Sequence, residues 1–410
     1  MKRLSLLLFL GVLFASGCVR VTNVSSITNP TPTATQRTIP FTLVAPTEPP
    51  PAPTDMPPTA TITLTPTITP TPTITPTLPP PPTPLPGAVG PYHYDFMVNP
   101  LTGLPVDDIA QLNRRPIVAK ISNAPPLVRP QAGLDYADIV FEHYAEGGLT
   151  RFSAVFYTHL PQRVGSIRSA RLIDNEVVPM YEALLVYSGA SNGVNAVIAA
   201  SEFFERTYMG ILYGRPYYWR DDEIPMPHNM FANLDAVSRL ATAEGLNDRP
   251  ALGGMAFLES PPPSPSGGAR LIEVEYMATR IRWEYDDAAN NYRRFSDGQP
   301  HYDALTDQQI TADNVVIIYA EHPRSDIAEA ESSAGVSYGL QIKLWFEGDA
   351  VLFRDGQRYE GRWLRPTRES MIQLRTRDGE LLYFKPGNTY FQVMRTPAEQ
   401  DPREEALRWE

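Results

Sequence analysis

The pattern of hydrophobic and polar positions divides the chain into an apolar start, a long unpatterned stretch and two patterned halves. An apolar run occupies residues 4–14, and residues 19–91 are rich in threonine and proline without a hydrophobic period. Apolar runs return in residues 92–258 and in residues 270–397, on either side of a Pro/Ser/Gly-rich linker over residues 259–269. Because proline and glycine clusters interrupt helices and strands, this linker predicts a boundary between two domains.

The first patterned half, residues 92–258, is expected to alternate strands with helices. Ser169, Ser191 and Asn233 each precede a segment with helical spacing and are expected to cap it, with the first two helices reaching about residues 183 and 206. This alternation predicts a mixed α/β layer domain. The expected strands span residues 116–122, 138–144, 149–157 and 184–187.

A hairpin is expected between the second and third of these strands. The pair Gly147-Gly148 supplies the positive φ angles that a two-residue hairpin turn needs. If these glycines form the whole turn, Tyr144 lies opposite Arg151 and Glu142 lies opposite Ser153.

The second patterned half is expected to contain strands alone. Short alternating or β-branched runs are separated by turn signals such as Asp297-Gly298 and Asp355-Gly356. This pattern predicts an all-β sandwich or barrel-like domain, followed by a tail over residues 398–410, and makes the chain α+β overall. The expected strands span residues 271–276, 280–285, 314–319, 340–346 and 390–394.

Composition and charge narrow the functional classes. The net charge is −11, whereas a nucleic-acid-binding protein normally carries a basic face, so nucleic acid is not expected as a partner. The chain has one cysteine, which excludes a disulfide framework and a cysteine-based zinc site. About half of the 43 prolines lie in residues 19–91, so this stretch is expected to be a disordered tether.

The start of the chain predicts a lipid anchor. The apolar run of residues 4–14 is too short to span a bilayer core of about 30 Å, so it indicates a signal peptide, residues 1–18. It ends in Ala15-Ser16-Gly17-Cys18, which resembles the lipobox of bacterial lipoproteins and implies lipidation of Cys18. The alternative is an ordinary cleavage site with an incidental cysteine. Lipidation would place the protein on the extracytoplasmic face of the bacterial cell membrane, held through its N-terminal lipid.

Three arginines of the first half are candidate anion ligands. Arg151 follows the Gly-Gly turn, and Arg168 and Arg171 lie where a strand is expected to lead into a helix. Forked guanidiniums near a helix N-terminus suit a phosphate or carboxylate. The alternative is internal pairing with Asp174 and Glu176, which follow closely in the chain.

Four more residues of the first half are candidate site residues. Ser191 begins a helix after a buried strand, and Arg220 precedes a proline-framed segment that contains His228 and Asn229. A histidine near carboxylates can act as a general base near neutral pH, although a structural role is commoner. We expect these four residues and the three arginines to line one anion-accepting cleft, and we expect neither a metal nor a cofactor.

Several motifs occur in a recognisable order: Arg129-Pro130-Gln131-Ala132-Gly133-Leu134, Glu146-Gly147-Gly148-Leu149-Thr150-Arg151, Gly165-Ser166-Ile167-Arg168-Ser169-Ala170-Arg171 and Pro227-His228-Asn229. They resemble those of the YerB-type bacterial lipoproteins, a two-domain family of unknown function. Tyr187 departs from the resemblance, since the family is expected to carry histidine there. The resemblance supports the architecture and location of the protein and implies no activity.

Two functional classes follow from the sequence. The first is a binding protein that holds an anionic envelope ligand, such as a glycan or a teichoic phosphate, or a partner protein through the arginine-rich cleft. The second is a hydrolase or transferase that acts on a phosphate- or glycan-containing wall substrate with His228 as general base. Binding is favoured because it needs the arginines alone, whereas catalysis needs His228 to join them.

Overall fold

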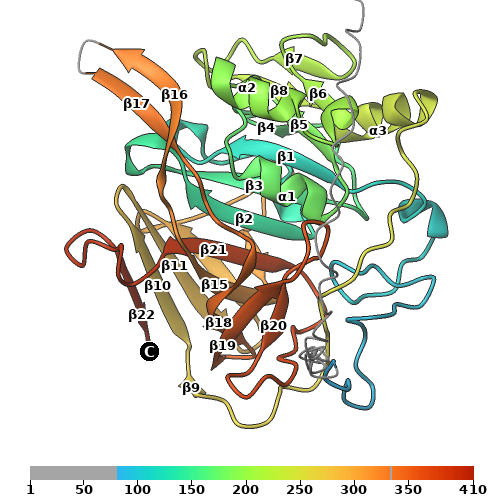
Figure 1. Ribbon diagram of the computed structural model, residues 1–410, viewed down its shortest axis with the longest axis vertical. Coiled ribbons are helices and arrows are strands. Elements are labelled where there is room, and N and C mark those ends of the chain that lie inside the picture. Colours follow the sequence, from blue (N-terminus) through green and yellow to red (C-terminus); the bar gives the residue numbers. More distant parts are fainter. Residues whose placement is uncertain (1–80, 333–334) are drawn as a thin grey trace, which may run out of the picture. The chain divides into compact units, whose positions relative to one another are not determined.

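The computed structural model describes residues 81–332 and 335–410 (Figure 1). The predicted signal peptide, Cys18 and most of the predicted tether lie outside the described residues. Within the described residues, which are mostly β with several sheets, no helix is long and apolar enough to cross a membrane.

One large sheet contains strands from both patterned halves. Its order is β20-β19-β18-β15-β21-β2-β3-β1-β5-β6, with β9 paired to β19. The strands of the first half are β1 (Ile117–Ser122), β2 (Ile139–Tyr144), β3 (Thr150–Phe156), β5 (Leu184–Tyr187) and β6 (Thr207–Met209). Those of the second half are β15 (Asn314–Ala320), β18 (Phe346–Arg354), β19 (Gln357–Arg365), β20 (Gln373–Arg375) and β21 (Thr389–Arg395), with β9 (Gly267–Gly268) from the predicted linker.

The sequence predicted that each half forms a domain with its own sheet. This prediction is wrong, because strands of both halves share the large sheet. Strand β21 lies between β15 and β2 and is parallel to both, so it joins the halves edge to edge. The first half leaves the β2 edge unpaired, and an unpaired buried edge needs a partner for its backbone groups. The pattern of a buried strand does not identify which strand pairs with it.

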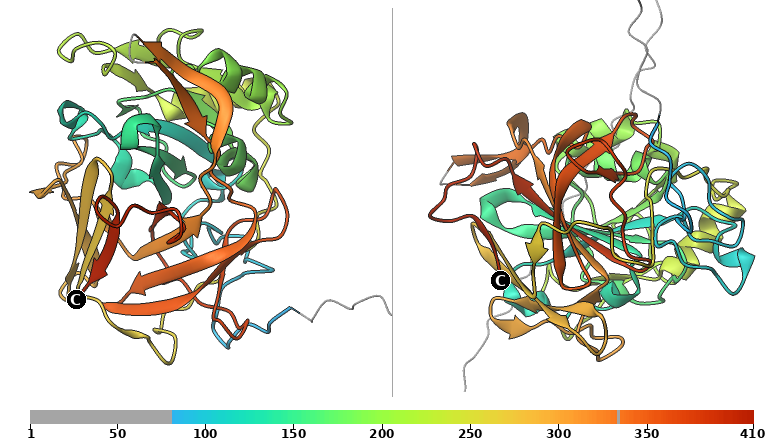
Figure 2. Two further views of the ribbon diagram at one scale, coloured as in Figure 1. Left: turned by 60° about the vertical axis from the view of Figure 1, so that its left-hand side comes forward. Right: turned by 90° about the horizontal axis from the view of Figure 1, so that it is seen from below.

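The rest of the second half forms a six-stranded sheet and a protruding arm, instead of a sandwich or barrel of its own (Figures 1 and 2). The predicted tail is not a tail alone, because it supplies β22, which pairs with β10. No single strand spans residues 340–346: residue 340 ends the arm, residue 346 begins β18, and the residues between them link the two. The arm is the two-stranded β16 (Arg324–Ser332) and β17 (Gly335–Leu340). The six-stranded sheet contains β10 (Leu271–Tyr276), β11 (Thr279–Asp286), β12 (Asn291–Ser296), β13 (Gln299–Pro300), β14 (Thr311–Ala312) and β22 (Ala406–Trp409).

Both faces of the large sheet are covered, which explains why its strands read as continuous apolar runs. Alternate residues of each strand enter different hydrophobic clusters: Phe141 lies in one and Val140 in the other. Helices α1 (Asp174–Met180) and α2 (Asn192–Ala199) cover the first face. Helix α3 (Leu234–Ala243) and the six-stranded sheet cover the second. A small sheet of β4 (Val164–Gly165), β7 (Tyr218–Arg220) and β8 (Met230–Ala232) completes the first half.

Two of the three predicted helix starts are confirmed. The Ser191 hydroxyl accepts from Val194 N at 3.4 Å, and the Asn233 side chain accepts from Ala236 N at 2.9 Å. The predicted cap at Ser169 is wrong, because α1 begins at residue 174. The backbone of residues 168–170 instead bonds across the sheet edge, with Arg168 N donating to Lys120 O and Ala170 N to Gly189 O.

The predicted hairpin register is wrong by one residue. Strands β2 and β3 are joined by a five-residue loop, and Tyr144 lies opposite Thr150 while Glu142 lies opposite Phe152. Gly147 and Gly148 do have positive φ angles of 71° and 73°, but they lie inside a short 3₁₀ turn (Glu146–Gly148). The longer loop changes the pairing and places Glu146 above the sheet edge.

Candidate functional site

The candidate site lies at one edge of the large sheet. The parallel strands β1, β5 and β6 end there, together with β2, and β3 begins there. In an open α/β sheet the loops that follow the carboxyl ends of parallel strands commonly form the ligand site. This edge gathers the β2–β3 loop, the start of β3, the loop between β4 and α1, and the start of α2 (Figure 1). Glu146 lies in the first of these segments, Arg151 in the second, and Arg168 and Arg171 in the third.

Two of the three arginines are tied to one carboxylate. Arg171 Nε lies 2.6 Å from Glu146 Oε1, and Arg171 Nη2 donates to Glu146 Oε2 at 2.6 Å. Arg151 Nη2 lies 4.0 Å from the same carboxylate, and Arg151 Nη1 donates to Ser169 O at 2.8 Å. Burial, followed by the nearby Arg171, lowers the pKa of Arg151 to about 9. The hairpin loop therefore supplies the partner of Arg171.

The two carboxylates expected as internal partners make other bonds. Asp174 Oδ2 accepts from the backbone N of Arg171 at 2.7 Å. Glu176 Oε2 accepts from Arg365 Nη1 at 2.7 Å, across to the second half. Internal pairing of the arginines does occur, but through Glu146.

The arm from the second half covers this edge. Ile327 of the arm packs against Gly193 at the start of α2. A Cβ added to Gly193 would lie 2.5 Å from Ile327 Cγ2, so the contact is too close for a larger residue. Glu329, also on the arm, has a side chain that is only 2 % exposed, and its Oε2 lies 3.6 Å from Arg171 Nη1. Burial raises the pKa of Glu329, against the opposing effect of Arg171. A carboxylate from outside the first half thus occupies a position beside the arginines.

Arg168 differs from the other two arginines because no ion pair involves it anywhere in residues 81–332 and 335–410. Its Nη1 donates to Pro227 O at 3.5 Å, and its Nε is buried without a hydrogen-bond partner. Burial, then Arg171, lowers the pKa of Arg168. The neighbouring His228 has its pKa lowered by burial and then by Arg168, and its Nδ1 is also buried and unpartnered.

The remaining candidates bond to each other or to a helix. Arg220 Nη1 donates to Asn229 Oδ1 at 2.8 Å, and Asn229 Nδ2 donates to Asp221 O at 3.1 Å. Among the described residues, no side-chain hydrogen bond or ion pair joins Arg220 or Asn229 to the three arginines. Ser191 serves as the α2 cap. A single cleft lined by all seven residues stays a prediction.

A fully buried polar cluster lies beneath the arginines and was missed by the sequence analysis. Lys120 Nζ lies 2.9 Å from Asp174 Oδ1 and 2.8 Å from Ser153 Oγ, and Ser153 Oγ donates to Asp174 Oδ1 at 2.9 Å. Lys120 Nζ also lies 2.8 Å from Nε2 of His143, whose Nδ1 faces Tyr144 O at 2.8 Å. Burial lowers the pKa of Lys120 to about 8 and that of His143 well below its usual value.

A second buried ion pair connects the two halves. Arg294 Nη2, on β12, donates to Glu142 Oε2, on β2, at 2.8 Å, and both side chains are 0 % exposed. Asn123 Nδ2 and Thr150 Oγ1 donate to the other Glu142 oxygen at 2.9 Å. The sequence did contain a signal for both buried clusters, because a charged residue inside an apolar strand must be paired when the strand is covered on both faces.

The charges near the sheet edge do not balance. Four cationic side chains, from Lys120, Arg151, Arg168 and Arg171, face three carboxylates, from Asp174, Glu146 and Glu329. Asp174 neutralises Lys120, and the other two carboxylates neutralise Arg151 and Arg171. The excess positive charge is therefore located at Arg168.

Sequence and fold comparisons give the same relationship. The family "Protein of unknown function (DUF3048)" matches through its N-terminal domain at residues 101–247 and through its C-terminal domain at residues 272–391. A protein of Bacillus subtilis (strain 168) named "Putative lipoprotein YerB" is 29% identical to this chain over 300 residues. The match covers 72% of this chain and 85% of YerB. The crystal structure of YerB from Bacillus subtilis matches with a TM-score of 0.62 and 26% identity, covering 76% of this chain and 99% of that chain.

Proposed function

Since this chain belongs to the DUF3048 family of unknown function, as its motifs predicted, we propose from its site that it is a lipid-anchored binding protein of the bacterial envelope. It holds a phosphate or carboxylate group of an envelope ligand at Arg168. The observation that carries this proposal is the half-buried Arg168 guanidinium, which has no carboxylate partner in the described part of the chain and has an unpartnered Nε.

Partial burial of a cation without a counter-charge costs part of its hydration, and a bound anion offsets that cost. Arginine presents a planar fork that matches the oxygens of a phosphate or carboxylate. His228 lies beside Arg168 with an unpartnered Nδ1, so it can supply a further polar contact to the same anion. Arg151 and Arg171 add positive potential while their own carboxylates hold them in place.

The hydrolase or transferase alternative lacks a comparable observation. A histidine base is normally oriented by a second group that bonds to its other ring nitrogen. No hydrogen bond joins the His228 ring to a carboxylate in residues 81–332 and 335–410. Binding is therefore the function that the geometry supports best.

Arg168→Gln is expected to weaken binding of inorganic phosphate roughly tenfold or more, because a hydrogen bond to a charged group contributes about 1.5–3 kcal/mol. The measurement is isothermal titration of phosphate into the folded protein, with melting followed on the same samples. The matched control is Arg239→Gln, since Arg239 is an exposed arginine already paired with Asp235 on α3. The control should bind phosphate as the wild type does.

Glu329→Gln is expected to change the phosphate affinity in the opposite direction in the same titration. The Glu329 carboxylate competes with an incoming anion for the arginines, so its neutralisation should tighten phosphate binding. Unchanged phosphate affinity in Arg168→Gln would refute the site. A loss of melting temperature in that variant, without any phosphate binding by the wild type, would make Arg168 a structural residue.

The lipid anchor is tested separately. We expect Cys18→Ala to release the protein from the membrane fraction or leave an unprocessed precursor, because the acyl chains are attached through that thiol. The measurement is incorporation of labelled palmitate together with membrane fractionation in a bacterial host. Labelling that persists in Cys18→Ala would contradict lipidation at this residue.

A further inference from the structure

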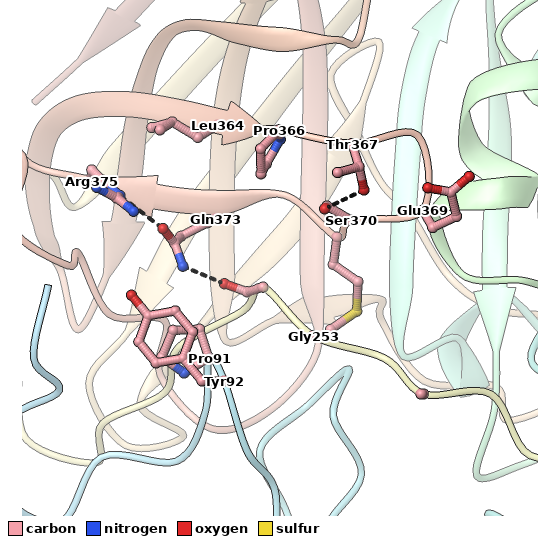
Figure 3. A pocket seen from close by; sticks show the side chains of 13 residues that line it. Pro91, Tyr92, Gly253, Leu364, Pro366, Thr367, Glu369, Ser370, Gln373 and Arg375 are labelled. Atoms are coloured by element: carbon pink, nitrogen blue, oxygen red, sulfur yellow. Dashed lines mark hydrogen bonds between the residues drawn. The ribbon is translucent and has the colours of Figure 1, made fainter. Parts of the chain in front are cut away.

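A pocket of about 540 Å³ lies beside Pro91 and Tyr92, and none of the seven candidate site residues lines it (Figure 3). Its volume falls within the range of about 300–1,000 Å³ typical of small-molecule sites. Three segments form its walls: the start of the folded chain, the stretch before the linker, and the β19–β20 connection. The lining residues are Pro91, Tyr92, Ala251, Gly253, Gly254, Leu364, Pro366, Thr367, Glu369, Ser370, Met371, Gln373 and Arg375.

The walls of the pocket are held together by close backbone contacts. Met371 N donates to Gly253 O at 3.1 Å, and Gly254 N donates to Pro91 O at 3.0 Å. A Cβ added to Gly254 would lie 2.5 Å from Met371 O, so the segments approach as closely as glycine permits. The pocket is therefore formed before a ligand arrives, which reduces the entropic cost of binding.

One end of the pocket combines an aromatic ring with a cation that has no carboxylate partner among the described residues. Tyr92 is 54% exposed, and its hydroxyl donates to Pro82 O at 3.2 Å, which holds the ring in position. Arg375 Nε donates to Gln373 Oε1 at 2.8 Å, and Gln373 Nε2 in turn bonds to Gly254 O at 3.4 Å. Arg375 Nη1 also donates to Gly379 O at 3.5 Å, but Arg375 makes no ion pair with any other described residue, so no carboxylate neutralises its charge.

The rest of the lining is rich in short polar groups. The hydroxyls of Thr367 and Ser370 lie 2.8 Å apart, and the exposed Glu369 lies at the end of the pocket away from Arg375 (Figure 3). Hydroxyl, amide and carboxylate groups that line the same pocket as an aromatic ring match the hydroxyl edges and apolar faces of a saccharide. The position of Glu369 favours a ligand whose own negative charge faces Arg375.

We propose that this pocket binds an acidic saccharide. The sugar ring lies on Tyr92, its carboxylate pairs with Arg375, and its hydroxyl and acylamino groups bond to Gln373 and to the hydroxyls of Thr367 and Ser370. A proline-rich peptide could also contact Tyr92, but it offers no anion to Arg375 and few partners for the hydroxyls. The proposal does not depend on the anion site at Arg168.

The test compares N-acetylmuramic acid with N-acetylglucosamine, which lacks the lactyl ether that carries the carboxylate, each titrated into the complete folded chain. We expect N-acetylmuramic acid to bind at least roughly tenfold more tightly, since a charge-assisted bond adds about 1.5–3 kcal/mol. Arg375→Gln should remove that preference, and Tyr92→Ala should weaken both sugars. The control is Arg377→Gln, two residues along, whose side chain is 68% exposed and pairs with Glu360.

Three outcomes would overturn the proposal. The first is that neither sugar binds. The second is that the two sugars bind with equal affinity to the wild type and to Arg375→Gln. The third is that a Thr-Pro repeat peptide binds at Tyr92 while the sugars do not. Phosphate binding at Arg168 is measured separately, so failure here leaves that proposal standing, and the reverse also holds.

Discussion

Replacement of Glu142 by alanine is expected to lower the melting temperature by on the order of 10 °C. The change leaves the Arg294 guanidinium, which is 0 % exposed, without its carboxylate, and two of its nitrogens already lack partners. Breaking a buried ion pair from one side costs about 3–5 kcal/mol. Each kcal/mol shifts the midpoint of a domain of about 150–250 residues by about 2–4 °C, and the lower figure applies to the larger folded part of this chain.

The matched control for this variant is Glu347→Ala. Glu347 also pairs with an arginine, Arg362, but both side chains are about half exposed, so the expected loss is under about 1 kcal/mol. The double variant Glu142→Leu/Arg294→Met should recover much of the loss, because it leaves no buried charge. Equal melting temperatures for Glu142→Ala and Glu347→Ala would show that the pair does not hold the halves together.

Lys120→Met is expected to destabilise the protein by a similar amount, about 3–5 kcal/mol. The methionine fills the volume but removes the cation that lies 2.9 Å from the buried Asp174 carboxylate. It also removes a donor from Ser153 and His143, which are themselves fully buried. Urea unfolding at neutral pH measures the loss. The control is Lys343→Met, because Lys343 is partly exposed and pairs with Glu321 at the surface.

The pH dependence of the same variants distinguishes the buried amine from a simple packing defect. The pKa of Lys120 is about 8 in the folded protein and 10.5 for a free side chain, so the unfolded chain binds more protons between these values. Stability from this group therefore rises with pH from about 8 to about 10.5. The stability difference between the wild type and Lys120→Met should grow between about pH 7.5 and about pH 9.5. A difference that stays constant would contradict the lowered pKa.

Local patterns in the sequence predicted much of the fold. The strand at residues 271–276 and the short strand at residues 184–187 are observed at those positions, because two-residue alternation and compact apolar runs depend only on neighbouring residues. The caps at Ser191 and Asn233 are equally local, since each side chain bonds to a backbone N–H three residues along.

The predicted site residues are brought together only in part. The structure brings Arg168, on the arginine-bearing loop, next to His228. The sequence did not reveal that Glu146 pairs with Arg171, because that pairing depends on a hairpin loop three residues longer than the Gly-Gly pair. Lys120 was overlooked because it lies inside an apolar strand, where burial of both faces is a property of the assembled sheet.

The sequence by itself determined the family, most strands of the large sheet and two of the three helix starts. Only the tertiary structure decided that β21 joins β2, that the arm places Glu329 beside Arg171, and that Arg168 is left without a carboxylate. The physical reason is that hydrophobic period and capping act between neighbours in the chain. Edge pairing and charge compensation instead depend on distant segments. The fold decides which strand pairs with an open sheet edge and which carboxylate reaches a cation.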